Sequence, residues 1–529
     1  MFVAREGVIA SLPVVSDLGR TESSPAATLA REAAREVPHL VLAWSTEQPE
    51  LVGYAAPIED ARLLGRGAAE PGDPAPRLVF GAHRPSGPSW APPLEGTRLS
   101  RRQLLITPAP DGSLAVRSVG RCPLLVDGKG VDSAVVVPGD TLVLHDLLVL
   151  LVVSRRPTWF LERRHATADA RGFGAPDAHG IVGESPAAWD LRASLAFAAQ
   201  SREHVLVCGE SGAGKELAAH AVHTLSSRRG RPFVTRNAAT LPEGLVDAEL
   251  FGNARGYPYT GMSERPGLIG EADGGTLFLD EIGEMRHDLQ AHLLRVMDHG
   301  GEYQRLGEAR PRRADIRLVA ATNRPLAALK HDFTARFPVR VRVPGLNERP
   351  EDIPLLVLHV LAQWAARDPN GLCARFFEKA APRPPAPRVD PALVEALLQH
   401  EYTHHVRELE SVLWTALSTS PDNTIELTDQ VRAKLRAAER PTNERPSTAH
   451  RAQRGTATVE TAGGADSGPS QPAPAEDAER QAIRAALAKT GGKVAPAAEL
   501  LGLSRHALHR RLRRYGLRGS AAEGESAGD

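Results

Sequence analysis

The sequence has few cysteines, no long apolar run and no net charge. Its three cysteines stand at positions 122, 208 and 373 of 529, a spacing that suits neither a disulfide framework nor a metal site. The most apolar run, TLVLHDLLVLLVV at 141–153, is interrupted by His145 and Asp146 and is too short to span a bilayer. The chain does not open with a basic segment followed by an apolar one, which argues against a signal peptide. We therefore expect a cytoplasmic protein with no membrane partner.

The zero net charge is an average over unequal parts. Hydrophobic residues make up 42% of the chain and charged residues 24%, as in an ordinary globular protein. Residues 480–518, however, contain ten Lys and Arg residues against one acid, Glu499. A basic segment on a neutral chain predicts a polyanionic partner at that end.

Stretches rich in proline, glycine and small polar residues divide the chain. One at 165–180 predicts a hinge, and one at 381–391 predicts a loop insertion within a helical region. A third, at 440–475, has almost no large apolar residues, so we expect a disordered linker there. The length of the chain also indicates more than one hydrophobic core.

The blocks between these stretches differ in hydrophobic pattern. Residues 39–156 contain short apolar runs between Gly, Pro and Asp turns, which predicts a β-sandwich. These runs include LVLAW, RLVF, QLLITP, SLAVRSV and DTLVLHDLLVLLVV. Residues 179–438 alternate apolar strands with amphipathic helices, the pattern of an α/β domain. Residues 476–519 predict helices only.

The segment HVLVCGESGAGKELAAHAVHTL at 204–225 predicts a buried strand, a glycine-rich turn and a helix. Gly209, Gly214 and Lys215 fit the phosphate-loop pattern, in which backbone N–H groups wrap phosphate oxygens and the lysine neutralises them. Because Glu216 stands where Ser or Thr is usual, a hydroxyl ligand for magnesium must come from elsewhere or from water. The residues predicted to contact the nucleotide here are Gly209, Glu210, Ser211, Gly212, Ala213, Gly214, Lys215 and Glu216.

Two later strands predict the other half of this site. The run GGTLFLDEIGE at 274–284 ends an apolar strand in Asp280 and Glu281, at the sheet edge where α/β folds present ligands to a nucleotide. Asp280 is suited to hold Mg²⁺, and Glu281 to polarise the attacking water. The strand IRLVAATN ends in Asn323, which is well placed to sense a γ-phosphate. Together these segments predict an ATPase that uses ATP and Mg²⁺.

Seven motifs carry a family resemblance. They resemble, in order, the AAA+ domain of sigma-54-dependent transcription activators, and they read GESGAGKE, ELFGNARG, ADGGTLFLDEIGEM, LQAHLLRVM, IRLVAATNRPL, ARFPVRVRVPGLNERPEDIPLL and HHVRELESVL. The resemblance implies an α/β ATPase subdomain at 179–346 and a helical lid at 347–438, and it makes Glu216 the expected residue. It also implies a lid arginine at Arg407 and arginine fingers, reaching a neighbouring subunit, at Arg336 and Lys330. Such fingers imply a ring of identical subunits. A lysine at 330 keeps the charge but loses the planar fork of arginine.

The stretch GNARGYPYTGM corresponds to the family's loop that engages sigma-54, whose consensus is Gly-Ala-Phe-Thr-Gly-Ala. Ungapped counting from Asp280 puts Tyr259 at the family's threonine, and a slip of one residue puts Thr260 there instead. Pro258 fixes one φ angle and stiffens the tip. The predicted contact loop is Gly256, Tyr257, Pro258, Tyr259, Thr260 and Gly261.

The tail at 476–519 predicts a helix, a Gly-Gly break, a short helix, a turn at Gly502 and a basic helix. It resembles the Fis-type helix-turn-helix domain, which implies binding to enhancer-like DNA, normally as a dimer. Residues placed to contact DNA, by base readout, phosphate contact or helix capping, are Ser504, Arg505, His506, His509, Arg510, Arg513 and Arg514.

The strand-rich block at 39–156 resembles a forkhead-associated (FHA) domain. Its motifs GRG and LSRRQ supply Arg66, Ser100 and Arg101, two cations and a hydroxyl suited to the phosphate of a phosphothreonine peptide. Gln103 stands where that family has histidine, and the usual Asn-Gly is replaced around Pro123. A sandwich that serves only oligomer or domain contacts is the alternative.

These features predict a transcription regulator with an FHA-like sensor, an AAA+ ring and a DNA-binding tail. Its partners would be DNA, sigma-54 RNA polymerase, further copies of the chain and a phosphothreonine protein or Ser/Thr kinase. A DNA-bound signalling adaptor, or an AAA+ regulator that does not act on sigma-54, is the alternative that the changed loop and Lys330 favour. A metabolic phosphate-loop enzyme is disfavoured because it leaves the tail unexplained.

Overall fold

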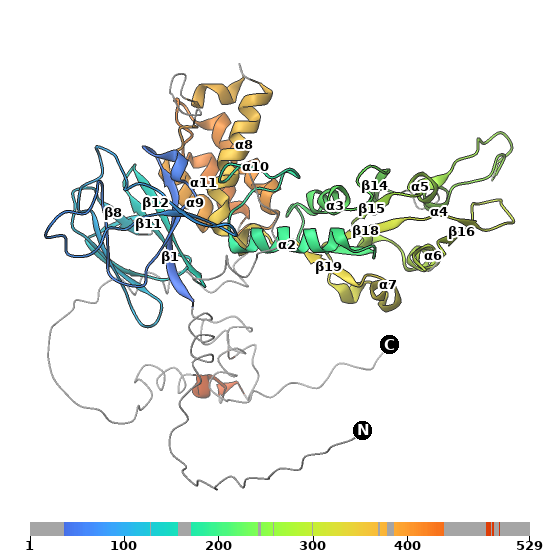
Figure 1. Ribbon diagram of the computed structural model, residues 1–529, viewed down its shortest axis with the longest axis horizontal. Helices are drawn as coiled ribbons and strands as arrows, with labels where there is room; N and C mark the ends of the chain where they lie inside the picture. Colours follow the sequence, from blue (N-terminus) through green and yellow to red (C-terminus); the bar gives the residue numbers. More distant parts are fainter. Residues whose placement is uncertain are drawn as a thin grey trace, which may run out of the picture.

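The computed structural model describes residues 36–126, 128–156, 171–241, 245–257, 259–298, 300–368, 371–377, 386–438, 483–487, 489–490 and 497. A strand-rich lobe, a helical lobe and an α/β lobe make up most of this part of the chain (Figure 1). The predicted linker at 440–475, Pro258 and the predicted DNA-contacting residues from Ser504 to Arg514 lie outside the described residues. Within the described ranges, no helix is long and apolar enough to cross a membrane.

The N-terminal lobe consists of two antiparallel sheets. Its strands are β1 (Val37–Ser45), β2 (Ala55–Pro57), β3 (Arg62–Leu64), β4 (Gly81–Arg84), β5 (Gly87–Trp90), β6 (Leu104–Pro108), β7 (Leu114–Ser118), β8 (Leu124–Val126), β9 (Lys129–Val131), β10 (Ser133–Val136), β11 (Thr141–Leu144) and β12 (Leu148–Arg155). One sheet has the order β5-β4-β2-β1-β12-β11-β8-β9, and the other has the order β10-β7-β6-β3. The strand-rich character predicted for this block is confirmed.

The burial of the strands shows which faces are covered. Strand β7 alternates between buried and exposed residues, as expected of a sheet with one solvated face. Every residue of β1 is buried, and so is all of β12 except Ser154. These two strands pair from Val37 opposite Arg155 to Ser45 opposite Leu148. They are therefore covered on both faces, once by the second sheet and once by another part of the molecule.

Two predicted strands differ from the observed ones. The run at 141–153 forms two strands, β11 and β12, because the chain reverses at His145 and Asp146, where Asp146 adopts a left-handed φ of 53°. The predicted strand RLVF at 77–80 makes only one isolated bridge, between Arg77 and Leu63. Arg77 is instead held by an ion pair of 3.0 Å with Asp73.

The central lobe is an α/β domain, as predicted. Its five-stranded parallel sheet has the order β14-β15-β18-β13-β19, and a two-stranded hairpin pairs β16 with β17. The strands are β13 (Val205–Cys208), β14 (Phe233–Asn237), β15 (Thr276–Asp280), β16 (Glu302–Tyr303), β17 (Arg312–Arg313), β18 (Arg317–Thr322) and β19 (Val339–Arg342). The helices are α2 (Pro186–Gln200), α3 (Lys215–Thr224), α4 (Val246–Phe251), α5 (Gly267–Glu271), α6 (His287–Met297) and α7 (His331–Ala335).

Alternate residues of the parallel strands enter two different cores. Leu206, Leu277 and Leu279 belong to one buried cluster. Val207 and Phe278 belong to the other. The sheet is therefore covered on both faces, and its ligand-binding groups must lie at a strand edge.

The helical lobe follows β19. It contains α8 (Ile353–Arg367), α9 (Pro391–Gln399), α10 (His405–Thr419) and α11 (Asp429–Ala438). Asp390 caps α9 by accepting a hydrogen bond of 2.9 Å from the backbone N–H of Ala392. Helices α10 and α11 pack against each other, so this lobe has the helical character predicted for the lid.

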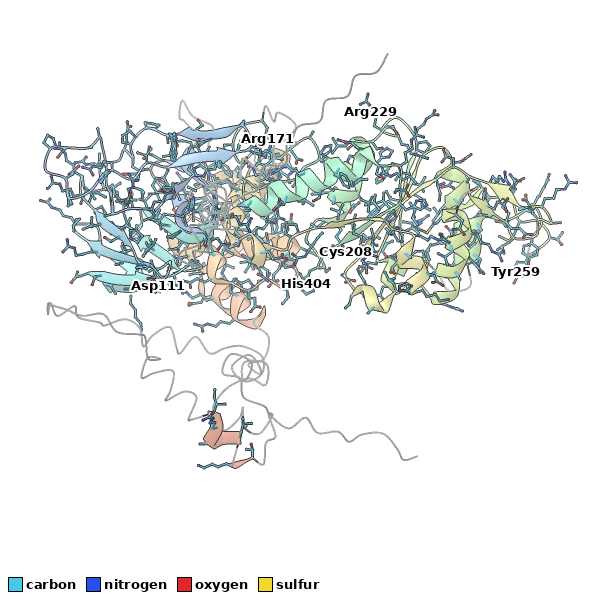
Figure 2. All side chains as sticks on the ribbon, turned by 60° about the horizontal axis from the view of Figure 1, so that its bottom comes forward. Asp111, Arg171, Cys208, Arg229, Tyr259 and His404 are labelled. Atoms are coloured by element: carbon cyan, nitrogen blue, oxygen red, sulfur yellow. The ribbon has the colours of Figure 1, made fainter. Side chains whose placement is uncertain are left out.

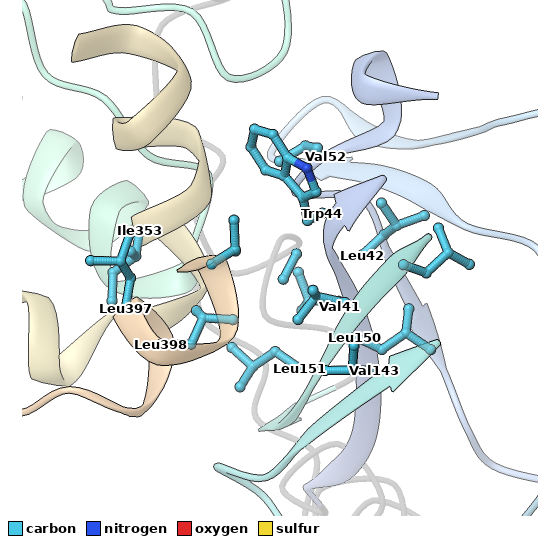
Figure 3. Close-up of a cluster of buried hydrophobic side chains, with 14 of the residues drawn as sticks. Val41, Leu42, Trp44, Val52, Val143, Leu150, Leu151, Ile353, Leu397 and Leu398 are labelled. Atoms are coloured by element: carbon cyan, nitrogen blue, oxygen red, sulfur yellow. The ribbon is translucent and has the colours of Figure 1, made fainter. Parts of the chain in front are cut away.

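The strand-rich lobe packs directly on the helical lobe. Val41, Trp44 and Leu151 of the sheet share one buried cluster with Ile353 and Leu398 of the helices, as Figure 3 shows. This contact covers the second face of β1 and β12, and α9 touches β1, β11 and β12. The interface between the two lobes thus explains why β1 and β12 are buried on both faces.

The described part of the predicted hinge, residues 171–180, is also bound in place. Phe173 stacks edge-on against Tyr54 at 4.8 Å between ring centroids. Arg84 donates to the backbone carbonyl of Arg171 at 2.8 Å and forms an ion pair of 2.7 Å with Glu184. These contacts join the segment to the strand-rich lobe.

Candidate nucleotide-binding site

The predicted phosphate loop lies between β13 and α3. Gly212 and Gly214 have φ angles of 78° and 103°, in the left-handed region that glycine adopts without strain. A Cβ on Gly209 would lie 2.9 Å from the carbonyl oxygen of Val343, so only glycine fits there. The loop leads into the N-terminus of α3, where unpaired backbone N–H groups favour an anion.

Lys215 lies buried at the start of α3 and joins the loop to the acidic strand. Its ammonium donates to the backbone carbonyl of Glu210 at 3.0 Å. Burial lowers the pKa of Lys215, the carboxylates of Asp280 and Glu281 oppose this shift, and the Arg407 guanidinium adds to it. Strands β13 and β15 flank β18 in the parallel sheet, so the lysine and the two carboxylates lie at the same sheet edge, and Arg407 lies beside Gly212 of the loop. The structure therefore brings together residues that the sequence analysis took from three separate segments.

Asp280 and Glu281 lie at the carboxyl end of β15, near the middle of the sheet. Glu281 adopts a left-handed φ of 52°, which is unusual for a residue other than glycine and is typical of functional positions. The Asp280 carboxylate accepts a hydrogen bond of 2.9 Å from the backbone N–H of Glu281. This hydrogen bond ties the Asp280 carboxylate to the turn that carries Glu281.

Asn237 is a site residue that the sequence analysis missed. It ends β14, the neighbour of β15, and its side-chain N–H donates to the Glu281 carboxylate at 3.1 Å. Its side-chain oxygen accepts from the backbone N–H of Ala239 at 2.8 Å, which holds the amide in place. The sequence offers little signal for it, because the strand FVTRN has only two apolar residues and already contains Thr and Arg before Asn237.

Asn323 directly follows β18, the strand between β13 and β15, and its side chain is exposed. The backbone N–H of Gly209 donates to the carbonyl of Thr322 at 3.2 Å. The parallel sheet thus places Asn323 next to the phosphate loop, and its role as a γ-phosphate sensor stays a prediction.

The helical lobe closes against the loop. The backbone N–H at Val406 donates to the Gly212 carbonyl at 3.2 Å, one residue before Arg407. Ala213 is buried, Ser211 is half-buried, and Glu216 is exposed on α3. The lid arginine therefore lies beside the phosphate loop within a single chain.

The two residues predicted to be fingers lie at the two ends of the short helix α7. Lys330 precedes this helix, and Arg336 follows it. Arg336 forms an ion pair of 2.9 Å with Asp298, and its side chain is 51% exposed. Nothing in this geometry assigns either residue to the site of its own chain, and their role across a subunit boundary stays a prediction.

The predicted contact loop projects from the end of the α/β lobe. Figure 2 shows Tyr259 at the far end of the molecule from Asp111 of the strand-rich lobe. Tyr259 is 74% exposed, whereas Tyr257 packs against Gly307 of the chain segment between β16 and β17. Buried Asn253 holds the base of the loop, because its side-chain N–H groups donate to three loop carbonyls at 3.0–3.1 Å.

Two other segments of the chain pair with the base of the loop. The backbone of Asn253 bridges both Arg265 and Leu306, and Gly256 donates to the Met262 carbonyl at 2.8 Å. Gly256 and Gly261, at the two ends of the tip, have φ angles of 79° and 104°. Thr260 is exposed between them. A tight turn thus presents the tip residues to solvent.

The three residues predicted to bind phosphopeptide lie together on the strand-rich lobe. The backbone N–H of Arg66 donates to the Ser100 carbonyl at 3.1 Å, and the Ser100 hydroxyl accepts from the backbone N–H of Arg121 at 3.0 Å. Arg101 forms an ion pair of 2.9 Å with Glu70. The two loops that carry the predicted cations are therefore neighbours.

Two regions of the chain match known protein families. Residues 181–344 match the sigma-54 interaction domain, and residues 474–515 match the Fis family of bacterial regulatory proteins. The nitric oxide reductase transcription regulator NorR2 of Cupriavidus necator is 37% identical over 343 residues, which cover 64% of this chain and 63% of NorR2. The transcriptional regulatory protein ZraR of Escherichia coli is 36% identical, over 63% of this chain and 68% of ZraR.

A third relative extends the match. The DNA-binding transcriptional regulator NtrC of a Bradyrhizobium strain is 35% identical over 69% of this chain and 75% of that protein. The crystal structure of NtrX from Brucella abortus in complex with ATP is 28% identical, with a TM-score of 0.41, over 64% of this chain and 69% of NtrX. The chain spans 63% of NorR2 and 68% of ZraR, so about a third of each relative has no counterpart in the matched region.

Proposed function

We propose, on the premise that the chain belongs to the family of sigma-54-dependent transcriptional activators, that it hydrolyses ATP to remodel sigma-54 RNA polymerase at promoters. It is an ATPase of the AAA+ class with a helix-turn-helix segment of the Fis family. The residues that perform each step of ATP hydrolysis, and the protein on which the ATPase acts, are proposals.

One observation carries the assignment of the ATP site. Lys215 follows β13, Asp280 and Glu281 lie at the end of β15, and these strands flank β18 in the parallel sheet. The lid residues next to Arg407 contact Gly212 of the phosphate loop, so residues from three parts of the chain lie at one edge of the sheet. Lys215 and the loop N–H groups would hold the phosphates, and Arg407 would bring the lid onto them. Glu281, oriented by Asn237, would accept the proton of the attacking water.

The donors at this edge fit Mg²⁺. Magnesium in nucleotide sites takes one or two carboxylates and completes its shell with phosphate oxygens and water. Asp280 supplies such a carboxylate at the end of β15. Among the described residues, no three His, Cys, Asp or Glu side chains group together as an all-protein metal site would require. Asp280 would hold the ion, which when bound supplies positive charge to the phosphate oxygens.

Hydrolysis would need a neighbouring subunit. Arg336 directly follows α7, and its half-exposed side chain forms a surface ion pair with Asp298, a weak contact that another chain could replace. We propose a homo-oligomeric ring, built from dimers, in which Arg336 and Lys330 reach the ATP site of the next subunit. Arginine supplied in this way stabilises charge that develops on the transferred phosphoryl group.

The exposed loop would carry the mechanical output. Tyr259 is 74% exposed at the end of the α/β lobe, and the chain reaches it through a base fixed by Asn253. A stiff base with an exposed tip suits a loop that pushes on a partner when the site closes. We propose that residues 256–261 contact sigma-54.

Capture of purified sigma-54 tests this proposal. The full-length protein is incubated with ADP–aluminium fluoride or with ADP alone, and bound sigma-54 is measured after pulldown. We expect capture only with the transition-state analogue, and loss of capture in the Tyr259→Ala, Thr260→Ala double variant. Ser411→Ala, far along the chain on α10, is the control and should capture as the unmodified protein does. Intact ATP hydrolysis without capture would mean that the ring acts on another partner.

The tail would bring this activity to enhancer-like DNA. We propose that Arg505, His506, His509 and Arg510 read base edges, that Arg513 and Arg514 contact phosphates, and that Ser504 caps the helix. Binding to a promoter fragment at rising salt separates these roles. Arg513→Ala should weaken binding to all sequences and reduce the salt slope by about 1, whereas Arg510→Ala should mainly reduce discrimination between sequences.

We also propose that the strand-rich lobe is FHA-like and receives a Ser/Thr-kinase signal. Its support is the neighbourhood of Arg66, Ser100 and Arg101. The Arg101–Glu70 pair is 68% and 41% exposed, a weak pair that a phosphate dianion can replace. A phosphothreonine peptide library should bind the protein, and Arg66→Ala should abolish binding while Arg117→Ala on β7 does not. Equal binding of unphosphorylated peptides would contradict the proposal.

A second candidate function is a DNA-bound signalling adaptor or an AAA+ regulator that does not act on sigma-54. It is favoured by Lys330 at a finger position and by proline in the contact loop. Steady-state ATP hydrolysis with and without DNA separates the adaptor from a motor, because a motor turns over ATP and responds to DNA, whereas an adaptor binds nucleotide without turnover. Capture of sigma-54 then separates a motor that acts on sigma-54 from one that acts on another partner.

A further inference from the structure

His405 occupies an unusual position at the start of α10. It is 1% exposed and has a left-handed φ of 47°, although it is not glycine. Backbone strain of this kind persists only where the surrounding contacts hold it. In the segment HHVRELESVL, the family resemblance assigns a role to Arg407, two residues after His405, but no role to either histidine.

Both ring nitrogens of His405 have partners from distant parts of the chain. Nδ1 lies 3.3 Å from the backbone nitrogen of Leu346, and Nε2 lies 2.8 Å from the Glu210 carboxylate. Because a backbone N–H can only donate, Nδ1 accepts, and the neutral ring carries its proton on Nε2. The Nε2–H group therefore donates to Glu210.

The two partners belong to different working parts of the ATPase. Glu210 is a residue of the phosphate loop, and its backbone carbonyl also accepts from Lys215. Leu346 lies where the α/β lobe passes into the helical lobe, in the turn that precedes α8. His405 itself opens the helix that carries Arg407. One imidazole thus connects the phosphate loop, the junction of the lobes and the lid helix.

The packing around the ring leaves it little freedom. A Cβ placed on Gly345 would lie 2.5 Å from both Cε1 and Nε2 of His405, so the junction presses directly on the ring. Next to it, Val406 donates to Gly212 of the loop at 3.2 Å. His405 thus lies in close contact with the junction on one side and with the phosphate loop on the other.

We propose that His405 is a positioning residue that couples nucleotide binding in the phosphate loop to the angle of the lid. The inference rests on the proposed ATP site. In this role His405 touches no phosphate and instead holds Glu210 and the first turn of α10, so that Arg407 meets the nucleotide in one orientation. Removing the ring would release the lid from the loop.

A double-mutant cycle on nucleotide affinity tests the coupling directly. His405→Ala, Glu210→Ala and the double variant are prepared in the full-length protein, and affinity for a fluorescent ADP analogue is measured with Mg²⁺. Loss of a hydrogen bond to a charged group should weaken binding about tenfold in each single variant. If the two residues act as one unit, the double variant should be no weaker than the weaker single variant. A loss in the double variant equal to the product of the two single losses would overturn the proposal.

Two further variants separate coupling from simple loss of structure. His404→Ala alters the exposed neighbour, whose Nδ1 contacts the Thr403 hydroxyl at 3.0 Å, and should leave affinity unchanged. His405→Gln keeps one donor and one acceptor and should recover part of the affinity, even if His405→Ala folds poorly. Equal losses in His405→Gln and His405→Ala, with both proteins folded, would contradict the hydrogen-bonded bridge.

The same measurements distinguish this inference from the proposed function. If the unmodified protein binds no ADP, the ATP site is wrong and the role of His405 falls with it. If the unmodified protein binds and hydrolyses nucleotide but the cycle is additive, the ATP site stands and only the coupling role is refuted.

Discussion

Arg155, at the end of β12, and Glu351, before α8, form an ion pair of 2.8 Å whose side chains are 5% and 9% exposed. Burial raises the pKa of Glu351, and the Arg155 guanidinium opposes that shift. The pair crosses the contact between the strand-rich lobe and the lid, beside a continuous apolar cluster (Figure 3). The N-terminal lobe is thus attached to the helical lobe, which also contacts the phosphate loop through Val406 and Gly212.

Breaking this pair on one side should be costly. Arg155→Met leaves the Glu351 carboxylate buried without its cation, which we expect to reduce the free energy of unfolding by about 3–5 kcal/mol. Urea unfolding followed by tryptophan fluorescence measures the loss, since buried Trp44 lies in the same apolar cluster. The double variant Arg155→Leu, Glu351→Leu removes both charges and should recover most of the stability. A loss below about 1 kcal/mol in Arg155→Met would mean that water reaches Glu351.

Glu281→Gln should separate nucleotide binding from hydrolysis. The amide keeps the size of the side chain and its contact with Asn237 but cannot accept a proton from water. We expect kcat for ATP hydrolysis to fall by about 10²-fold or more, with ADP affinity nearly unchanged. Steady-state kinetics and a binding titration on the same preparation check both halves. An unchanged kcat would remove Glu281 from the role of general base.

Mixing experiments should reveal a site shared between subunits. The Arg336→Ala variant lacks the predicted finger but has an intact phosphate loop. The Lys215→Ala variant keeps the finger residue but lacks the lysine that would bind the phosphates. Each variant alone should be nearly inactive, and a mixture should regain part of the hydrolysis rate, because some sites then combine an intact loop with an intact finger. Asp298→Ala, which removes only the surface partner of Arg336, serves as the control and should stay active. No recovery on mixing would argue that each site is complete within one chain.

Acid should weaken the N-terminal lobe through its buried histidines. Burial is the main cause that lowers the pKa of His39 from 6.5 to about 3, and of His83 to about 4; the nearby Arg155 charge adds to both shifts. Between these values and 6.5, the unfolded chain binds protons that the folded chain does not, so stability falls as the pH falls. Each histidine should contribute a loss of about 1.4 kcal/mol per pH unit across its window.

Thermal unfolding at pH 7 and pH 5.5 measures this dependence. The non-titrating variant His39→Phe should show a smaller decrease between the two pH values than the unmodified protein. Its loss of the contact between His39 Nδ1 and the Val37 carbonyl affects both pH values alike, so the difference between them isolates the protonation. An identical decrease in the variant would mean that other groups dominate.

The residues that could be predicted from sequence are those whose chemistry depends on near neighbours. The phosphate loop needs glycines and a lysine within a few positions, and Asp280 with Glu281 needs only the end of an apolar strand. Their convergence also followed from sequence, because the carboxyl ends of parallel strands share one sheet edge. The reversal at His145 and Asp146 was missed, because two apolar strands joined by a short turn leave the same pattern as one interrupted run.

Asn237, His405 and the contact of β1 and β12 with the lid depended instead on the tertiary structure. Asn237 acts on Glu281 across neighbouring strands, and His405 reaches Glu210 across 195 positions of the chain. A buried strand leaves the same apolar pattern whether a second sheet or a helical lobe covers its other face. The sequence by itself determined the local chemistry of the loops and strand ends, because backbone conformation and side-chain type act over a few residues. Only the tertiary structure decided which of these groups hold one another, because such contacts form between surfaces that are distant along the chain.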